Sequence, residues 1–102
     1  MVLYKYRLKG EVTMTIKIEV KDSTIYPNTK VIYTDNEVTP ELVAKVQEVL
    51  KENSAVRVSF DVIGETLHTI LSNQLKFALR DISKEYVAEV GRYKCLIWKV
   101  AA

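Results

Sequence analysis

The chain has 102 residues, of which 48% are hydrophobic and 27% charged, and its formal net charge is +2. This composition excludes a disordered protein, and the length predicts a single domain over residues 1–102. The small net charge does not by itself indicate a nucleic-acid-binding protein. No apolar run approaches the roughly 18 residues that a membrane span needs. The one cysteine, Cys95, excludes an internal disulfide, and we expect a cytoplasmic protein.

The first predicted elements are strands. Even-numbered positions from Tyr4 to Val20 are apolar apart from Gly10, and the odd positions are polar, which is typical of half-buried strands. One straight strand of this length would run about 55 Å at 3.3 Å per residue, which is too long for the domain. We therefore expect a separate strand over residues 2–9 and a reversal near Gly10. Turn residues at positions 27 and 28 then precede a strand over about residues 30–34.

The clearest helix follows in the stretch TPELVAKVQEVLKEN. Thr39 is the expected N-cap, and Pro40 occupies the first helical position, where its missing N–H costs nothing. Apolar residues recur at helical spacing and form the predicted buried stripe: Leu42, Val43, Val46, Val49 and Leu50. Residues 55–63 then alternate as a strand, with Val56, Val58, Phe60 and Val62 on one face.

The stretch VTPELVAKV at residues 38–46 is echoed by ISKEYVAEV at residues 82–90. The same offset, without gaps, lays the strand at 12–18 on the strand at 56–62. This shared pattern predicts an internal duplication of a strand–strand–helix unit, with pseudo-repeats at about residues 11–53 and 55–91. The alternative is two unrelated strand–helix segments that share their phase.

Residues 66–80 fit either a helix or a hairpin. Their counterpart in the first repeat contains Pro27 and a β-branched run, which favours a hairpin that turns near Ser72 and Asn73. Ser83 would then cap a second helix that ends near Gly91. Residues 92–100 read as a last strand outside the repeat.

The predicted fold class is α+β. We expect a two-layer sandwich in which a mostly antiparallel sheet carries two helices on one face. The expected order of elements, from the strand at 30–34 onward, is that of a ferredoxin-like split βαβ arrangement.

The side chains that carry chemistry are sparse. His68 is the only histidine, and a zinc site needs about four ligands in close pairs, so we expect no metal and a histidine at the surface or its boundary. Cys95 is expected to be a small buried hydrophobic residue. There is no Gly-rich phosphate loop, and Glu85 and Glu89 look solvated. We therefore expect no cofactor, no catalytic residue and no enzymatic activity.

Two aromatic stretches remain, and they suggest binding. An exposed sheet edge can take up an extended peptide by strand addition, and Tyr, Trp and Arg are enriched where interface energy concentrates. We predict a protein–protein interaction module that binds a peptide or partner at a sheet edge or in the groove between the two repeats, self-association included. The predicted contact residues are Tyr4, Tyr6, Arg7, Arg92, Tyr93, Lys94 and Trp98. The alternatives to a binding role are that Tyr4 and Tyr6 are buried in the core and that the last strand is buried on both faces.

The sequence also allows a second function. Aromatic side chains interleaved with cations can bind single-stranded nucleic acid, and the candidates are Lys5, Arg7, Lys9 and Lys17. The objection is geometric, because alternate residues of a strand point to opposite faces and would separate the tyrosines from the cations.

The abundance of Val, Ile, Lys, Glu and Tyr, with few Gln, His and Cys, leans towards a thermophilic source. In stretches such as VTMTIKIEV and TPELVAKVQEVLKEN, the chain resembles the small orphan proteins of filamentous viruses that infect hyperthermophilic archaea. The resemblance extends over the whole chain but includes no diagnostic motif. It implies expression in a hot archaeal host cytoplasm, and it carries over no functional residue.

Overall fold

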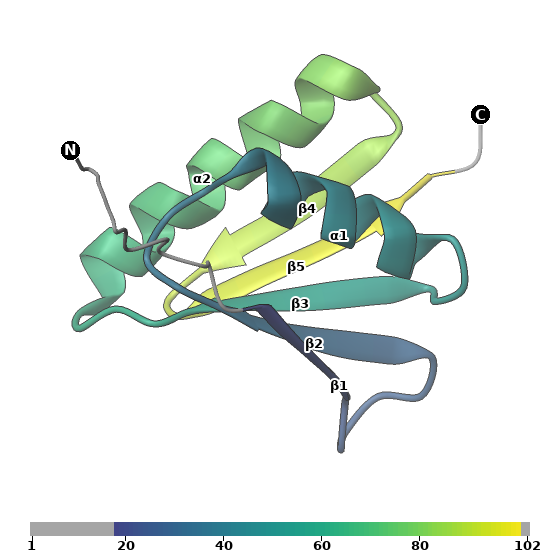
Figure 1. Ribbon diagram of the computed structural model, residues 1–102, viewed down its shortest axis with the longest axis horizontal. Helices are drawn as coiled ribbons and strands as arrows, with labels where there is room; N and C mark the ends of the chain where they lie inside the picture. Colours follow the sequence, from purple (N-terminus) through teal and green to yellow (C-terminus); the bar gives the residue numbers. More distant parts are fainter. Residues whose placement is uncertain (1–17, 101–102) are drawn as a thin grey trace, which may run out of the picture.

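In the computed structural model, residues 18–100 are described. They form the strands β1 (Ile18–Asp22), β2 (Thr29–Thr34), β3 (Ala55–Phe60), β4 (Tyr86–Gly91) and β5 (Lys94–Lys99), and the helices α1 (Pro40–Leu50) and α2 (Glu65–Ile82). The strands make one mixed sheet in the order β1-β2-β3-β5-β4 (Figure 1). Only β2 and β3 pair in parallel, and the other neighbours are antiparallel. The predicted α+β class is confirmed.

Helix α1 forms where the sequence predicts it. The Thr39 hydroxyl accepts a hydrogen bond from the backbone N–H of Leu42 at 3.2 Å, and Pro40 begins the helix. Leu42, Val46 and Val49 are buried. The helix connects two parallel strands, which a tight turn cannot do, and its apolar stripe packs on the sheet it crosses.

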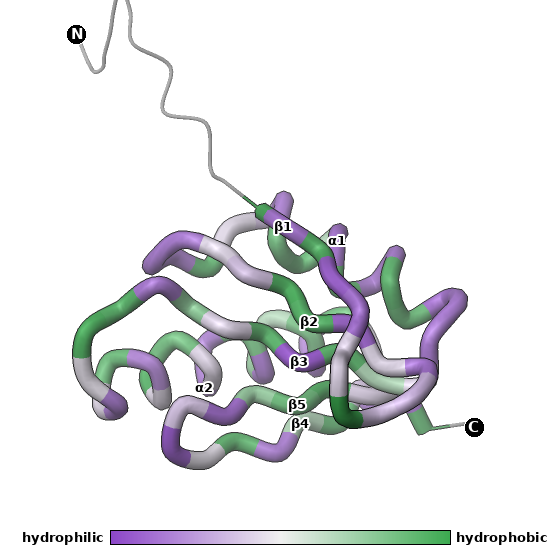
Figure 2. Tube along the Cα trace, turned by 90° about the horizontal axis from the view of Figure 1, so that it is seen from below, coloured by the Kyte–Doolittle hydropathy of each residue, from purple (hydrophilic) through white to green (hydrophobic). Residues whose placement is uncertain are grey.

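The core lies between the sheet and both helices. Even-numbered residues of β2 and β3 point into it, including Ile32, Val56 and Val58, which are all fully buried. On β5 the core residues are Cys95 and Ile97, because Ile97 pairs with Val56. The odd-numbered residues point to the other face, so hydrophilic and hydrophobic residues follow one another along β3 (Figure 2). The two helices therefore share one face of the sheet, as predicted.

Residues 65–82 form helix α2, and the hairpin that the repeat favoured is wrong. The helix buries Leu71, Leu75 and Leu79 at intervals of four residues, so one stripe meets the sheet. His68 and Ser72 lie on the same buried side. A hairpin would have divided these residues between two faces of the sheet.

The second helix predicted at residues 83–91 is also wrong, since residues 86–91 form strand β4. Ser83 does not begin a helix but ends one: its backbone N–H donates to Leu79 O at 3.0 Å, while its own φ of −157° and ψ of 137° are extended. Its hydroxyl then accepts from the backbone N–H of Glu85 at 3.2 Å, which turns the chain into β4. Strand β4 pairs along its whole length with β5 in a hairpin, and this pairing outweighs the resemblance of its sequence to α1.

The two stretches that suggested a duplication thus have different structures, one helical and one extended. The structure does not show the duplication, and residues 18–100 show no seam between two similar halves. The order from β2 onward is strand–helix–strand–helix–strand–strand, which differs from the expected split βαβ arrangement. The predicted last strand is present as β5, but it lies inside the sheet between β3 and β4.

The strand predicted over residues 2–9 and the reversal near Gly10 lie outside the described residues. Of the apolar positions that continue this pattern, Ile18 is half-buried against the core and Val20 is 39% exposed. Among residues 18–100, neither helix combines the length and the apolar character that crossing a membrane requires.

Candidate functional site: the open face of the sheet

No described element covers the face of the sheet opposite the helices, which we call the open face. Strand register defines its side chains. One row crosses all five strands and alternates charged with apolar residues: Lys21, Val31, Arg57, Leu96 and Glu89. A parallel row carries Thr29, Ala55, Trp98 and Val87. The apolar members of both rows are only half-buried, which is unlike the core face.

The loop between β1 and β2, residues 23–28, stands beside this face. It is held by its own hydrogen bonds: the Ser23 hydroxyl accepts from the backbone N–H groups of Ile25 at 3.2 Å and Tyr26 at 3.1 Å. Asn28, with φ of 57°, closes the turn, and its carbonyl accepts from Ser54 N–H at 2.8 Å. Ile25 and Tyr26 are nevertheless 71% and 62% exposed. The loop therefore presents apolar side chains on a fixed backbone.

Loop and open face together enclose a groove of about 800 Å³. Its wall on the loop side includes Ile25 and Tyr26, and its floor includes Val31 and Leu96. The cations of the floor and rim are Lys21, Arg57 and Lys94. The groove thus combines an apolar floor with positive charge beside it.

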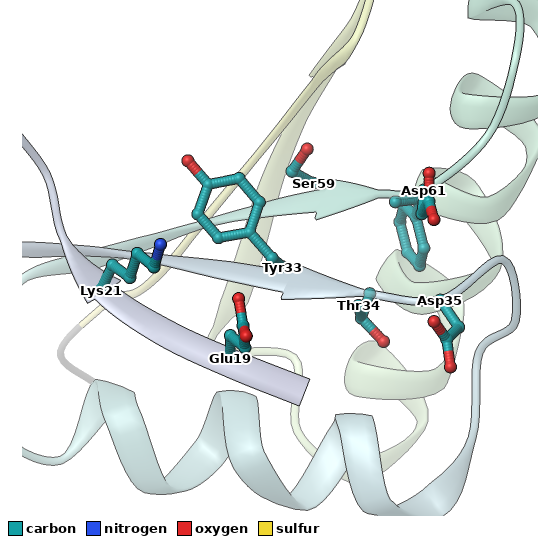
Figure 3. A pocket seen from close by; sticks show the side chains of 8 residues that line it. Glu19, Lys21, Tyr33, Thr34, Asp35, Ser59 and Asp61 are labelled. Carbon is teal, nitrogen blue, oxygen red and sulfur yellow. The ribbon is translucent and has the colours of Figure 1, made fainter. Parts of the chain in front are cut away.

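A second hollow, of about 330 Å³, lies where β2 and β3 end (Figure 3). It shares Lys21, Tyr33 and Ser59 with the groove. Figure 3 shows Tyr33 and Ser59 on one side of the sheet, with the Thr34 side chain pointing to the other. Tyr33 is 45% exposed, and the Lys21 ammonium lies 5.7 Å from the centroid of its ring. Tyr33 is therefore an aromatic platform at the junction of the two hollows.

Charges on the open face nearly balance. Lys94 forms an ion pair with Glu89 at 3.2 Å across β4 and β5. Arg57 donates from Nη2 to the carbonyl of Tyr93 at 3.3 Å, which extends its guanidinium along the face. With Lys21 and Glu19 also on this face, three cations stand against two carboxylates. The surface is mildly positive rather than strongly basic.

The structure separates the residues predicted for partner binding. Lys94 and Trp98 lie on the open face. Arg92 and Tyr93 form the β4–β5 turn and lie towards α2 instead: Arg92 Nε pairs with Glu65 at 3.4 Å, and the Tyr93 ring packs edge-on to the His68 ring at 5.5 Å. Because β5 is an inner strand, paired with β4 along its length and with β3 through residues 96–98, it is not the sheet edge that strand addition would use. The remaining predicted residues are Tyr4, Lys5, Tyr6, Arg7, Lys9 and Lys17, which lie outside the described part of the chain.

The sequence prediction missed five residues that shape the open face: Lys21, Val31, Tyr33, Arg57 and Leu96. The signal was present, because Arg57 and its odd-numbered neighbours alternate with the predicted core residues of β3. The sequence did not show which strands lie side by side, and strand order and register decide which of these residues meet on the open face.

His68 is buried, with 1% of its surface exposed, and the expectation of a surface or boundary histidine is wrong. Its Nε2 accepts from the backbone N–H of Phe60 at 3.3 Å. Cys95 is fully buried, as predicted, and burial raises the pKa of its thiol to about 11. Across residues 18–100, no three His, Cys, Asp or Glu side chains are grouped so that they could hold a metal ion.

No protein-family model matches the sequence, and neither the curated proteins nor the solved structures include a significant match. The resemblance to orphan proteins of archaeal viruses therefore stays a prediction. What the chain binds must be inferred from its own surface.

Proposed function

We propose that this protein is a non-catalytic binding module whose open face takes up a peptide segment of a partner protein. The observation that carries the proposal is the groove between the 23–28 loop and the sheet, with exposed Ile25 and Tyr26 above a floor of Val31 and Leu96. Large apolar side chains left together at a surface are typical of interaction sites. The loop, with its backbone hydrogen-bonded to Ser23, supplies the wall of the groove, and the sheet supplies its floor.

The charges define the ligand. Lys21, Arg57 and Lys94 line the groove. A complementary segment carries large apolar side chains to fill the groove, flanked by Asp or Glu that pair with these cations. The near balance of charge on the face favours such a segment over a phosphate backbone, whose binding depends on many uncompensated cations.

Selection from a random-peptide library on the immobilised protein tests this proposal. We expect enrichment of apolar residues flanked by Asp and Glu. A synthetic peptide of the enriched sequence should bind about tenfold more weakly to Arg57→Gln and to Leu96→Ala, as expected for central interface residues. Lys76→Gln, on α2, is the matched control and should bind like the wild type. If no sequence were enriched, or if both open-face variants bound normally, the proposal would be wrong.

A second candidate function is binding of single-stranded nucleic acid, and Tyr33 is the observation that favours it. Its exposed ring beside Lys21 is a stacking platform of the kind that bases use. Anisotropy of labelled oligonucleotides at about 50 and 200 mM salt separates the two functions, because phosphate contacts weaken steeply with salt. Binding that collapses at the higher salt and is lost in Tyr33→Ala would replace the peptide proposal. Flat curves would eliminate this alternative.

A further inference from the structure

The outer side of helix α2 carries large apolar residues that are exposed in the described part of the chain. Leu67 is 42% exposed, Ile70 is 48% exposed and Phe77 is 63% exposed. Together with Gln74 they recur at intervals of three, four and three residues, so they form one stripe along the helix, which we call the α2 stripe. The stripe lies nearly opposite the buried side of Leu75 and Leu79. Its four members include no charged residue.

The α2 stripe is symmetric about position 72. Leu67 and Phe77 lie five residues before and after it, and Ile70 and Gln74 lie two residues before and after it. When two such helices pack antiparallel around a twofold axis, each residue meets its counterpart: Leu67 meets Phe77, and Ile70 meets Gln74. A twofold interface joins the same patch of both copies, and this spacing places each member of the α2 stripe opposite another member.

The two ends of helix α2 also fit this antiparallel arrangement. Helix α2 begins at Gly64, which provides no side-chain cap for the first backbone N–H groups. Asp81, exposed on the line of the stripe, lies nine residues after position 72, and Ile63 lies nine residues before it. Antiparallel packing therefore brings the Asp81 carboxylate of one copy to the uncapped helix start of the other. A carboxylate is favourable there, because the helix N-terminus carries partial positive charge and the first-turn carboxylate of Glu65 is already paired with Arg92 at 3.4 Å.

We propose that the protein forms a twofold dimer in which α2 packs antiparallel against α2 of a second copy. The dimer buries the α2 stripe and caps each helix with the partner's Asp81. The open face lies on the other side of the sheet and stays free for its own ligand. The dimer is thus independent of the proposed function.

Sedimentation of the full chain over a range of concentrations tests the dimer. The wild type should sediment at twice the 11.7 kDa of the chain, and Phe77→Glu and Ile70→Glu should sediment as monomers with unchanged circular dichroism. Ile25→Glu is the matched control, because Ile25 is also exposed and apolar but lies in the loop beside the open face. A monomeric wild type would overturn the proposal, as would dimers that persist in both α2 variants.

Disulfide cross-linking tests the antiparallel direction. Leu67→Cys and Phe77→Cys should cross-link when the two variants are mixed and oxidised, and each alone should not. The native Cys95 is buried and does not interfere. Cross-linking of each variant alone, with none added by mixing, would indicate parallel helices and would overturn the role of Asp81. In the antiparallel dimer, Asp81→Lys should weaken association while Asp81→Glu restores it.

Discussion

The Ser72 hydroxyl and the His68 imidazole, one helical turn apart inside α2, fix each other's hydrogen bonds. Ser72 Oγ donates to the backbone carbonyl of His68 at 2.7 Å, so it is free to accept at its lone pair from His68 Nδ1, 3.3 Å away. The proton of the neutral imidazole is therefore assigned to Nδ1, because Nε2 accepts from the backbone N–H of Phe60. This chain of hydrogen bonds satisfies a buried histidine and joins α2 to the end of β3.

Acid should destabilise the fold through His68. Burial, and then the charge of Arg57, lower the pKa of the folded-state imidazole from 6.5. The unfolded chain then binds the proton more readily, so the stability contribution is complete above about pH 6.5 and is lost as pH falls towards the folded-state pKa. Urea unfolding of the wild type between about pH 7.5 and 5.5 should show this loss. The free energy of unfolding of His68→Gln should change less with pH over this range. Equal slopes in the two proteins would show that folding does not lower the pKa of His68.

Alkali should destabilise the fold through Cys95. Burial raises the pKa of its thiol from 9.0 to about 11, while the Ser72 hydroxyl opposes the shift. Because the folded-state pKa is raised, the contribution of Cys95 to stability is complete below about pH 9. This contribution, roughly 2–3 kcal/mol, is lost as pH rises to about 11. Lysines and tyrosines titrate in the same range, so the measured quantity is the difference in slope between the wild type and Cys95→Ala. No difference would mean that the thiolate is tolerated in the core.

Removing the cap of α1 should cost about 1 kcal/mol. The Thr39 hydroxyl accepts from Leu42 N–H in a buried setting, and the Thr39→Ala variant leaves that donor without a partner. Thr39→Ser keeps the acceptor and should recover most of the loss. The free energy of unfolding from urea titration measures both. A Thr39→Ser variant as unstable as Thr39→Ala would show that the methyl packing of Thr39 matters more than its hydrogen bond.

Two leucines of α2 provide a matched comparison of burial. Leu75 is fully buried in the core, so the Leu75→Ala variant should lose about 2–5 kcal/mol of stability. Leu67, on the same helix, is 42% exposed, and at concentrations where the protein is monomeric its replacement by Ala should cost well under half as much. Thermal or urea unfolding of the two variants checks the ranking. Equal losses would show that Leu67 packs more tightly than its exposure indicates.

The local sequence by itself determined those elements for which every local pattern indicates the same structure. Helix α1 has a cap residue, a proline at its first position and an apolar stripe of the right period, and all three indicate the same structure. Strands β2, β3 and β5 were predicted, β3 from its alternating pattern and β2 from the turn residues before it, although β3 ends at Phe60 and not at residue 63. The α+β class and the shared helical face follow from these elements, because each has one apolar side to bury.

Tertiary structure decided the second half of the chain and the binding face. Residues 65–82 and 86–91 carry apolar residues that fit both the helical and the strand period. Their similarity to the first half of the chain favoured the wrong structure for each. The pairing of β4 with β5 and the packing of α2 on β3, β4 and β5 resolve the ambiguity. The packing of α2 joins it to strands on both sides of it in the sequence, and β5 of the hairpin pairs with β3, which lies far earlier in the chain, so no local pattern encodes these contacts. For the same reason only the assembled sheet shows that Val31, Tyr33, Arg57 and Leu96 meet on one open face, because strand order and register bring them together.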